Sequence, residues 1–189
     1  IFINNWINQS INNKGLYYKH DQVSDEIIVV SGFEFDRMKS IYFLAKNNIK
    51  VKVFCGNELE TWKKNRLYHP NINYVEKFLI GKEYKDVISQ SFLIISFLRK
   101  ANLDKQTSRS IEVPYYGGIL LTYRTNEHLN MFVENKEAIY FDSDLELLEK
   151  INLLKKNKEF YNSIKLNGMK KVQKFNEKIY INIVNEAVK

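Results

Sequence analysis

A group of polar side chains that can bind a phosphate lies in the middle of the sequence, in the stretch DKQTSRSIEVPYYGG. Asp104, Thr107, Arg109 and Glu112 fall within nine residues of one another. The planar guanidinium of Arg109 can bind two phosphate oxygens at once. A helix that begins near Thr107 would also point unpaired backbone N–H groups at an anion. Glu112, one turn further on, can accept hydrogen bonds from the two hydroxyls of a ribose. The stretch therefore predicts a seat for a nucleoside diphosphate.

The same residues also fit a purely structural interpretation. In that case a surface helix begins near Thr107, and Arg109 pairs with Asp104 or Glu112. Exposed ion pairs of this kind add little to stability and carry no function of their own. Local chemistry leaves both interpretations open, so the elements around the stretch have to decide between them.

Short apolar runs alternate with segments of helical spacing along most of the chain. The expected strands lie at 26–30, 49–54, 71–77, 92–98, 118–122 and 137–141. The expected helices lie at 33–48, 80–90, 107–116, from Thr125 onward, 143–156, 158–167 and 169–188. Because strands and helices alternate, the predicted fold class is α/β, a Rossmann-like, mainly parallel sheet with helices on both faces and C-terminal helices at the end.

Parallel sheets bind ligands beyond the carboxyl ends of their strands, and the quoted stretch joins two such ends. Ser31 and Gly32 follow another expected strand, and Arg37 lies one turn into the helix after it. These three residues are a second candidate contact for phosphate. The pair Gly117-Gly118 would allow a ligand to approach the backbone closely, or would simply end the preceding helix.

The composition limits the partners and the compartment. A net charge of +7 and a pI near 9.2 favour an anionic partner such as a nucleotide or a membrane surface, although the lysines are spread along the helical segments. Nucleic acid is not expected; its mark would be an affinity that falls steeply with salt. The single cysteine, Cys55, forms no internal disulfide, so a cytoplasmic location is the default. The three histidines and Cys55 have no metal-ligand spacing, so no metal is expected.

Beyond this local chemistry, the segment 104–150 resembles the CgeB-like (spore-maturation-type) group of GT-B glycosyltransferases. Their C-terminal domains carry a pattern much like D-x-x-T-x-R-x-F-E-I-P-A-x-G-G-x-x-L-T-E-R-T-x-E. The residues in register are Asp104, Thr107, Arg109, Glu112, Pro114, Gly117, Gly118, Thr122, Arg124, Thr125 and Glu127. The earlier VVSGFEFDR is similar to a strand and helix start of that family, with Ser31, Gly32 and Arg37 matching. Tyr123 departs from the pattern, since an acidic residue is common there, and Tyr115-Tyr116 replace small residues.

The resemblance implies that the chain is the nucleotide-sugar-binding half of a two-domain glycosyltransferase, with a UDP-sugar as the favoured donor and no cofactor. The donor contacts it implies are Ser31, Gly32, Arg37, Asp104, Thr107, Arg109, Glu112, Gly117, Gly118 and Arg124. Related retaining enzymes have two acidic residues separated by seven others, as Asp104 and Glu112 are. By analogy Glu112 would hold the ribose, and Asp104 would lie nearer the sugar as a candidate catalytic residue. An N-terminal acceptor domain would be missing, so this chain alone is expected to be inactive.

The expected domain organisation is a connecting segment at 1–25 followed by the nucleotide-sugar-binding domain at 26–189. The last helix would carry an apolar stripe of Ile179, Ile183 and Val184. Two other functions stay open. One is a non-catalytic module that binds a nucleotide or polyanion; peripheral membrane association is a separate expectation that follows from the basic charge. The other is a dehydrogenase-type Rossmann domain, which the absent three-glycine fingerprint disfavours.

Overall fold

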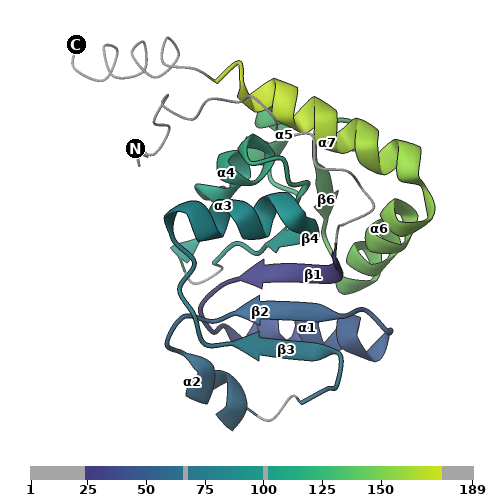
Figure 1. The fold of residues 1–189 in the computed structure, drawn as a ribbon. Coiled ribbons are helices and arrows are strands. Elements are labelled where there is room, and N and C mark those ends of the chain that lie inside the picture. The colour runs from purple at the N-terminus through teal and green to yellow at the C-terminus, as the bar shows by residue number, and fades with distance from the viewer. Residues whose placement is uncertain (1–23, 66–67, 100–101, 176–189) are drawn as a thin grey trace.

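The structure is a computed structural model, and it describes residues 24–65, 68–99 and 102–175. Six strands form one sheet in the order β3-β2-β1-β4-β5-β6, and every neighbouring pair is parallel (Figure 1). The strands are β1 (Ser24–Val30), β2 (Val51–Phe54), β3 (Ile72–Val75), β4 (Ser91–Ser96), β5 (Leu120–Tyr123) and β6 (Ile139–Phe141). The helices are α1 (Phe35–Lys46), α2 (Leu59–Lys64), α3 (Gly81–Gln90), α4 (Arg109–Tyr115), α5 (Asn126–Met131), α6 (Asp144–Lys156) and α7 (Lys158–Val172). The predicted fold class is confirmed.

Each face of the sheet has its own hydrophobic core, because successive strand residues point to opposite sides. In β1, Ile27 and Val29 face the core beneath α1 and α6, whereas Ile28 faces the core beneath α3 and α4. Figure 1 shows these two helical layers on either side of the strands. Both faces are covered, which explains why the strands read as continuous apolar runs rather than as alternating ones.

The end of the described chain differs from the sequence prediction. The sequence predicts two helices that meet at Gly168, but α7 runs unbroken from Lys158 to Val172. A Cβ at position 168 would lie 2.5 Å from the backbone oxygen of Glu137. Gly168 therefore allows α7 to pack closely against the segment before β6, and it does not end a helix. The predicted stripe of Ile179, Ile183 and Val184 lies outside the described residues.

The connections of the sheet reverse direction between β1 and β4. The chain passes from β1 to β2 and β3 in one direction and from β4 to β5 and β6 in the other, although β1 and β4 are neighbours. At such a reversal the loops that follow the two strands diverge, and ligands of α/β sheets bind between them. We call the edge of the sheet at the carboxyl ends of β1 and β4 the rim. Of the described helices, none is both long and apolar enough to cross a membrane.

Candidate functional site

The loop between β1 and α1 is held in place by a buried arginine. Arg37 is only 5% exposed, and its guanidinium donates to the carbonyl oxygens of Gly32 at 3.0 Å and of Leu98 at 3.3 Å. It also contacts Ser31 Oγ and pairs with Glu34 Oε2 at 3.0 Å. Leu98 follows β4, so Arg37 ties the two loops of the rim together.

Three arginines converge on this part of the rim. The pKa of Arg37 is lowered, first by burial and then by the positive charges of Arg99 and Arg109, while Glu34 opposes the shift. Positive charges held this close together repel one another, which is unfavourable. An anion placed among them would relieve that repulsion, so the rim is suited to a group such as a diphosphate.

The carboxylate of Glu58, which lies between β2 and α2, contacts the loop between β1 and α1. The backbone N–H of Phe33 donates to Glu58 Oε2. A Cβ at Gly32 would lie 2.8 Å from Glu58 Oε1, so the glycine leaves room for this carboxylate. Sequence reasoning missed Glu58, and its position soon after β2 is the one signal that places it near the rim.

Arg109 and Glu112 both lie in the first turn of the short helix α4. Arg109 Nε and Thr107 Oγ1 are buried without a hydrogen-bond partner among the described residues. Within that part of the chain Arg109 forms no ion pair with Asp104 or Glu112. The pairing that the structural interpretation requires is therefore not present. Buried polar atoms without partners are rare in proteins, and a missing ligand is one explanation for them.

Asp104 closes the turn that follows β4. Its Oδ2 accepts a hydrogen bond from the backbone N–H of Arg99 at 3.3 Å, and its own N–H donates to the Arg99 carbonyl oxygen at the same distance. The side chain is half-buried. Asp104 thus lies in the loop that leads to α4, on the same edge of the sheet as Arg109.

A buried histidine anchors the first turn of α4. His128 is fully buried, with Nδ1 2.9 Å from the carbonyl oxygen of Tyr123 and Nε2 2.8 Å from Ser110 Oγ. The carbonyl can only accept, so Nδ1 carries the proton and Nε2 accepts from the Ser110 hydroxyl. Ser110 Oγ in turn accepts from the Thr107 N–H at 3.2 Å. Burial lowers the pKa of His128, which favours this neutral form.

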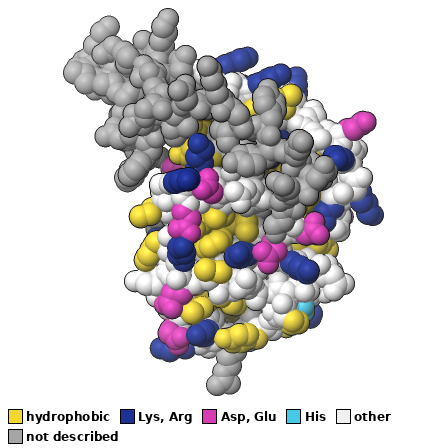
Figure 2. Space-filling model, in the orientation of Figure 1, with side chains coloured by type: hydrophobic (Ala, Val, Ile, Leu, Met, Phe, Trp, Pro, Cys, Tyr) yellow, Lys and Arg dark blue, Asp and Glu magenta, His cyan; other side chains and the backbone are white. Residues whose placement is uncertain are grey.

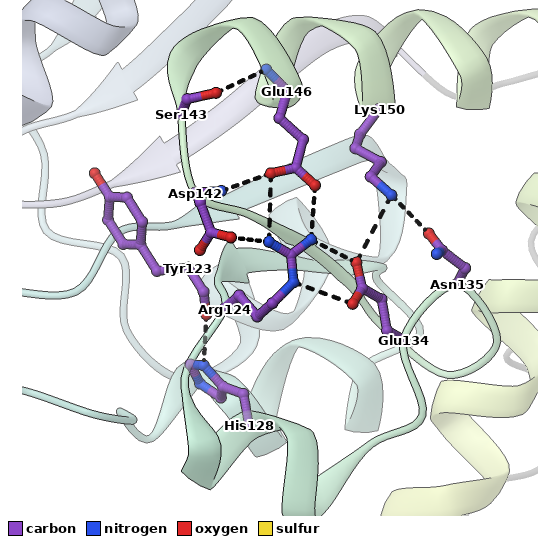
Figure 3. A network of polar contacts seen from close by, with 9 residues as sticks. All are labelled: Tyr123, Arg124, His128, Glu134, Asn135, Asp142, Ser143, Glu146 and Lys150. Carbon is purple, nitrogen blue, oxygen red and sulfur yellow. Dashed lines mark hydrogen bonds and ion pairs between the residues drawn. The ribbon is translucent and has the colours of Figure 1, made fainter.

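Arg124, by contrast, is fully engaged by carboxylates (Figure 3). Its Nε and Nη2 donate to the two oxygens of Glu134 at 3.1 and 2.8 Å. Nη2 donates to Glu146 Oε1 at 2.6 Å, and Nη1 contacts Asp142. Lys150 lies 3.7 Å from Glu134. These five residues form what we call the Arg124 network. Its hydrogen bonds lower the pKa values of Glu134 and Glu146.

The start of α6 fixes Glu146 within the Arg124 network. Ser143 caps the helix, and its Oγ accepts from the Glu146 N–H at 3.2 Å. The Glu146 carboxylate accepts from the Asp142 N–H at 2.8 Å. This is close to a capping box, in which a serine and a glutamate three residues later satisfy backbone donors at a helix start.

The double glycine lies at the opposite edge of the sheet. Gly117 has a φ of +79° and donates to the Pro114 carbonyl oxygen at 3.1 Å, so it ends α4 just before β5 begins. A Cβ at Gly118 would lie 3.0 Å from Ile88 and from Val113. These glycines serve the turn and the packing of α3 against α4.

The sequence-predicted residues therefore fall into three groups. The loops after β1 and β4 and the first turns of α1 and α4 bring seven of them to the rim: Ser31, Gly32, Arg37, Asp104, Thr107, Arg109 and Glu112. Arg124 follows β5 but is held by the Arg124 network, and Gly117 and Gly118 lie at the other edge. Among the described residues, no three His, Cys, Asp or Glu side chains are grouped to hold a metal ion.

Comparisons with known proteins identify the family. The sequence matches the family described as "Glycosyl transferase-like" over residues 37–179, about three quarters of the chain. A search of curated proteins gives no significant match.

The fold is similar to several solved structures at low sequence identity. One is the C-terminal domain of a glycosyl transferase group 1 family protein (LpcC) from Francisella tularensis, with a TM-score of 0.61, 10% identity and coverage of 87% of this chain and 93% of that chain. Another is Anabaena Alr3699/HepE in complex with UDP and glucose, with a TM-score of 0.68, 10% identity and coverage of 87% and 48%. A mutant of S. aureus TarM in complex with fondaparinux, alpha-GlcNAc-glycerol and UDP gives a TM-score of 0.66, 13% identity and coverage of 89% and 36%.

This chain thus spans nearly all of the isolated LpcC domain but less than half of the HepE and TarM chains. Its six-stranded parallel sheet with helices on both sides matches the C-terminal domain of GT-B glycosyltransferases. Because the family match extends over most of the sequence, the chain belongs to the glycosyl transferase-like family.

Proposed function

We propose that this chain is the donor-binding half of a CgeB-like glycosyltransferase and that it binds a nucleoside diphosphate sugar, a UDP-sugar in particular, at the rim. The observation that carries the proposal is the state of Arg109. It lies among like charges with Arg37 and Arg99, and its Nε is buried without a partner among the described residues. A diphosphate would supply both the missing acceptor and the missing negative charge.

The proposed contacts follow from the chemistry of each side chain. Arg109 and Thr107 bind the diphosphate, and Glu112 accepts from the ribose hydroxyls. Ser31 and Gly32 lie in the loop after β1, which Arg37 holds in place. Gly117, Gly118 and Arg124 are not among the proposed contacts, because the glycines lie at the opposite edge and the Arg124 guanidinium is occupied by carboxylates.

The proposed chemistry is electrostatic. Transfer of the sugar leaves a nucleoside diphosphate whose negative charge grows in the transition state, and fixed cations and hydroxyl donors stabilise that charge. Arg109 and Arg99 are the cations available for this role, so no metal is required. Asp104, half-buried in the loop before α4, is the candidate to face the sugar in a retaining transfer.

Two observations favour a small nucleotide over a polyanion. The neighbouring hollow between α1 and α6, about 260 Å³ in volume, is lined by Asp36, Asp142 and Asp144 with one cation, Lys39. Asp142 is paired with Arg124, but the other two carboxylates still make the hollow a poor site for phosphate. On the face seen in Figure 2, basic and acidic side chains are interleaved and form no continuous basic stripe. The solved structures of HepE and TarM contain UDP, which supports the choice of nucleotide.

A thermal-shift panel of UDP-, GDP-, ADP-, TDP- and CMP-sugars tests the proposal. A ligand at 100 times its dissociation constant stabilises a folded protein by ~2.7 kcal/mol, and we expect this shift for a UDP-sugar. Arg109→Ala, which removes the proposed diphosphate contact, is the matched control and should show a much smaller shift. A well-folded wild-type chain that none of the nucleotide sugars stabilises would contradict the proposal.

The isolated chain should bind the donor without transferring its sugar. It spans less than half of the HepE and TarM chains, and a donor site alone does not orient the attacking hydroxyl of an acceptor. Release of UDP from UDP-glucose, followed over hours, should stay at the rate of the buffer blank. Robust turnover by the 189-residue chain with an added acceptor would contradict the need for a second domain.

A further inference from the structure

The carboxylate of Glu112 is hydrogen-bonded to a tyrosine on a different helix. Tyr84, in α3, lies with its hydroxyl oxygen 2.9 Å from Glu112 Oε2. The two residues are 28 positions apart in the sequence, so only the packing of α3 beside α4 brings them together. The Tyr84 ring also packs edge-on against Tyr116, with ring centroids 6.1 Å apart.

The direction of this hydrogen bond is fixed by chemistry. An ionised carboxylate has no proton to give, so the Tyr84 hydroxyl donates to Glu112 Oε2. Burial and the charge of Glu112 both raise the pKa of Tyr84. The phenol therefore keeps its proton across the neutral range and remains a hydrogen-bond donor there.

The consequence is a carboxylate with one oxygen occupied and one oxygen available. Glu112 Oε1 has no hydrogen-bond partner in the part of the chain that the structure describes, and the side chain is half-buried. A glutamate that is already fixed in one rotamer loses little further freedom when it binds a ligand, and such preorganisation raises affinity. A free glutamate would have to be ordered at the moment of binding.

We propose that Tyr84 is a positioning residue that makes the site selective for ribonucleotides. By holding Glu112 Oε2 it aims the carboxylate at the ribose, so the site distinguishes a diphosphate with both ribose hydroxyls from its deoxy analogues. This inference rests on the proposed role of Glu112 in binding ribose. It adds a residue from α3, outside the sequence motif, to the determinants of that role.

Calorimetric titrations of UDP, 2′-deoxy-UDP and 3′-deoxy-UDP test the inference. The variants are Tyr84→Phe, Glu112→Ala and the double variant, each in the 189-residue chain. Tyr84→Phe removes only one hydroxyl, so it should fold, and its melting temperature checks this. Tyr116→Phe is the matched control, because that tyrosine lies in the same aromatic group and its hydroxyl forms no hydrogen bond with any described residue.

We expect wild type to bind UDP about tenfold more tightly than at least one deoxy analogue, as for the loss of one hydrogen bond to a charged group. In Tyr84→Phe that ratio should fall by about threefold or more, through weaker binding of UDP rather than tighter binding of the analogue. Tyr116→Phe should keep the wild-type ratio. In the Glu112→Ala background, Tyr84→Phe should change the UDP affinity by less than about twofold, because the two residues act as one unit.

The outcomes separate this inference from the proposed function. Suppose that Glu112→Ala weakens UDP binding. If Tyr84→Phe leaves UDP binding unchanged, or weakens the binding of UDP and of the deoxy analogues equally, the role of Tyr84 is overturned and the ribose role of Glu112 stands. If Glu112→Ala leaves the UDP affinity unchanged, both are overturned. Full additivity of the two substitutions would likewise overturn the inference, since it would mean that Tyr84 acts through packing alone.

Discussion

Arg109 and Arg124 match the same family motif, and the structure gives them opposite surroundings. Arg124 forms ion pairs with Glu134, Glu146 and Asp142, so its positive charge is neutralised within the protein. Arg109 lies close enough to Arg37 to lower the pKa of that arginine, and it has a buried nitrogen without a partner among the described residues. The difference teaches that one motif contains two kinds of arginine. Arg124 is neutralised by carboxylates of the protein, whereas Arg109 is the arginine that we propose binds the diphosphate.

The largest effect we expect comes from breaking the Arg124 network. Arg124→Ala leaves three carboxylates together with only Lys150 to offset them. Arg124 is 25% exposed, so the loss lies between the values for surface and buried ion pairs, at about 2 kcal/mol of unfolding free energy. Urea denaturation measures it. Arg109→Ala is the control and should change stability by less than about 0.5 kcal/mol.

Acid sensitivity sharpens the same comparison. The pKa values of Glu134 and Glu146 are lowered in the folded protein by hydrogen bonds from Arg124, below the ordinary value of 4.5. Their contribution to stability is therefore fully present above about pH 4.5 and is lost as the pH falls through the folded values. Urea unfolding from pH 7 to pH 3 should show a smaller decline for Arg124→Ala than for wild type. Parallel curves would contradict the network.

A smaller pH effect should come from His128, which supports the first turn of α4. Burial lowers its pKa below the ordinary 6.5, so the folded protein prefers the neutral form. Stability is then full above pH 6.5 and falls as the pH drops towards the folded value, with a slope of at most ~1.4 kcal/mol per pH unit. His128→Gln should remove this slope. His69→Gln, at a half-buried histidine outside the rim, should leave it in place.

The smallest effect should follow removal of the hydroxyl that pairs with His128. Ser110→Ala leaves His128 Nε2 without a donor at a fully buried position. We expect a loss of about 1 kcal/mol in unfolding free energy and a several-fold weaker affinity for UDP, because the start of α4 also carries Arg109. Denaturation and calorimetry measure the two quantities. A loss of stability with unchanged affinity would show that the first turn of α4 does not orient the donor site.

Much of the fold was predictable because its signals are local. An apolar run in the sequence predicts a buried strand such as β4, and Ser143 with Glu146 predicts the start of α6. Gly168 misled sequence reasoning for the opposite reason. Glycine disfavours a helix locally, but here a backbone oxygen from a distant segment leaves no room for a Cβ.

The site was only partly predictable, because its partners come from separate elements. The motif singles out Arg109, Glu112 and Arg124, but nothing in it reveals that Tyr84 supports Glu112. Nor does it reveal that Glu134 and Glu146 neutralise Arg124. Burial of His128 against Ser110 is likewise a product of how α5 packs on α4. Such contacts depend on tertiary packing, which spacing along the chain does not encode.

The most direct test titrates UDP and uridine into three proteins: wild type, Arg109→Ala and Arg124→Ala. We predict that Arg109→Ala weakens the affinity for UDP by roughly ten- to a hundredfold, because one hydrogen-bonded charge contact is lost, and leaves the affinity for uridine unchanged. We predict that folded Arg124→Ala binds UDP with an affinity within about twofold of wild type, because the Arg124 guanidinium is not among the proposed nucleotide contacts. Equal losses in both variants, or an unchanged UDP affinity in Arg109→Ala, would contradict the account.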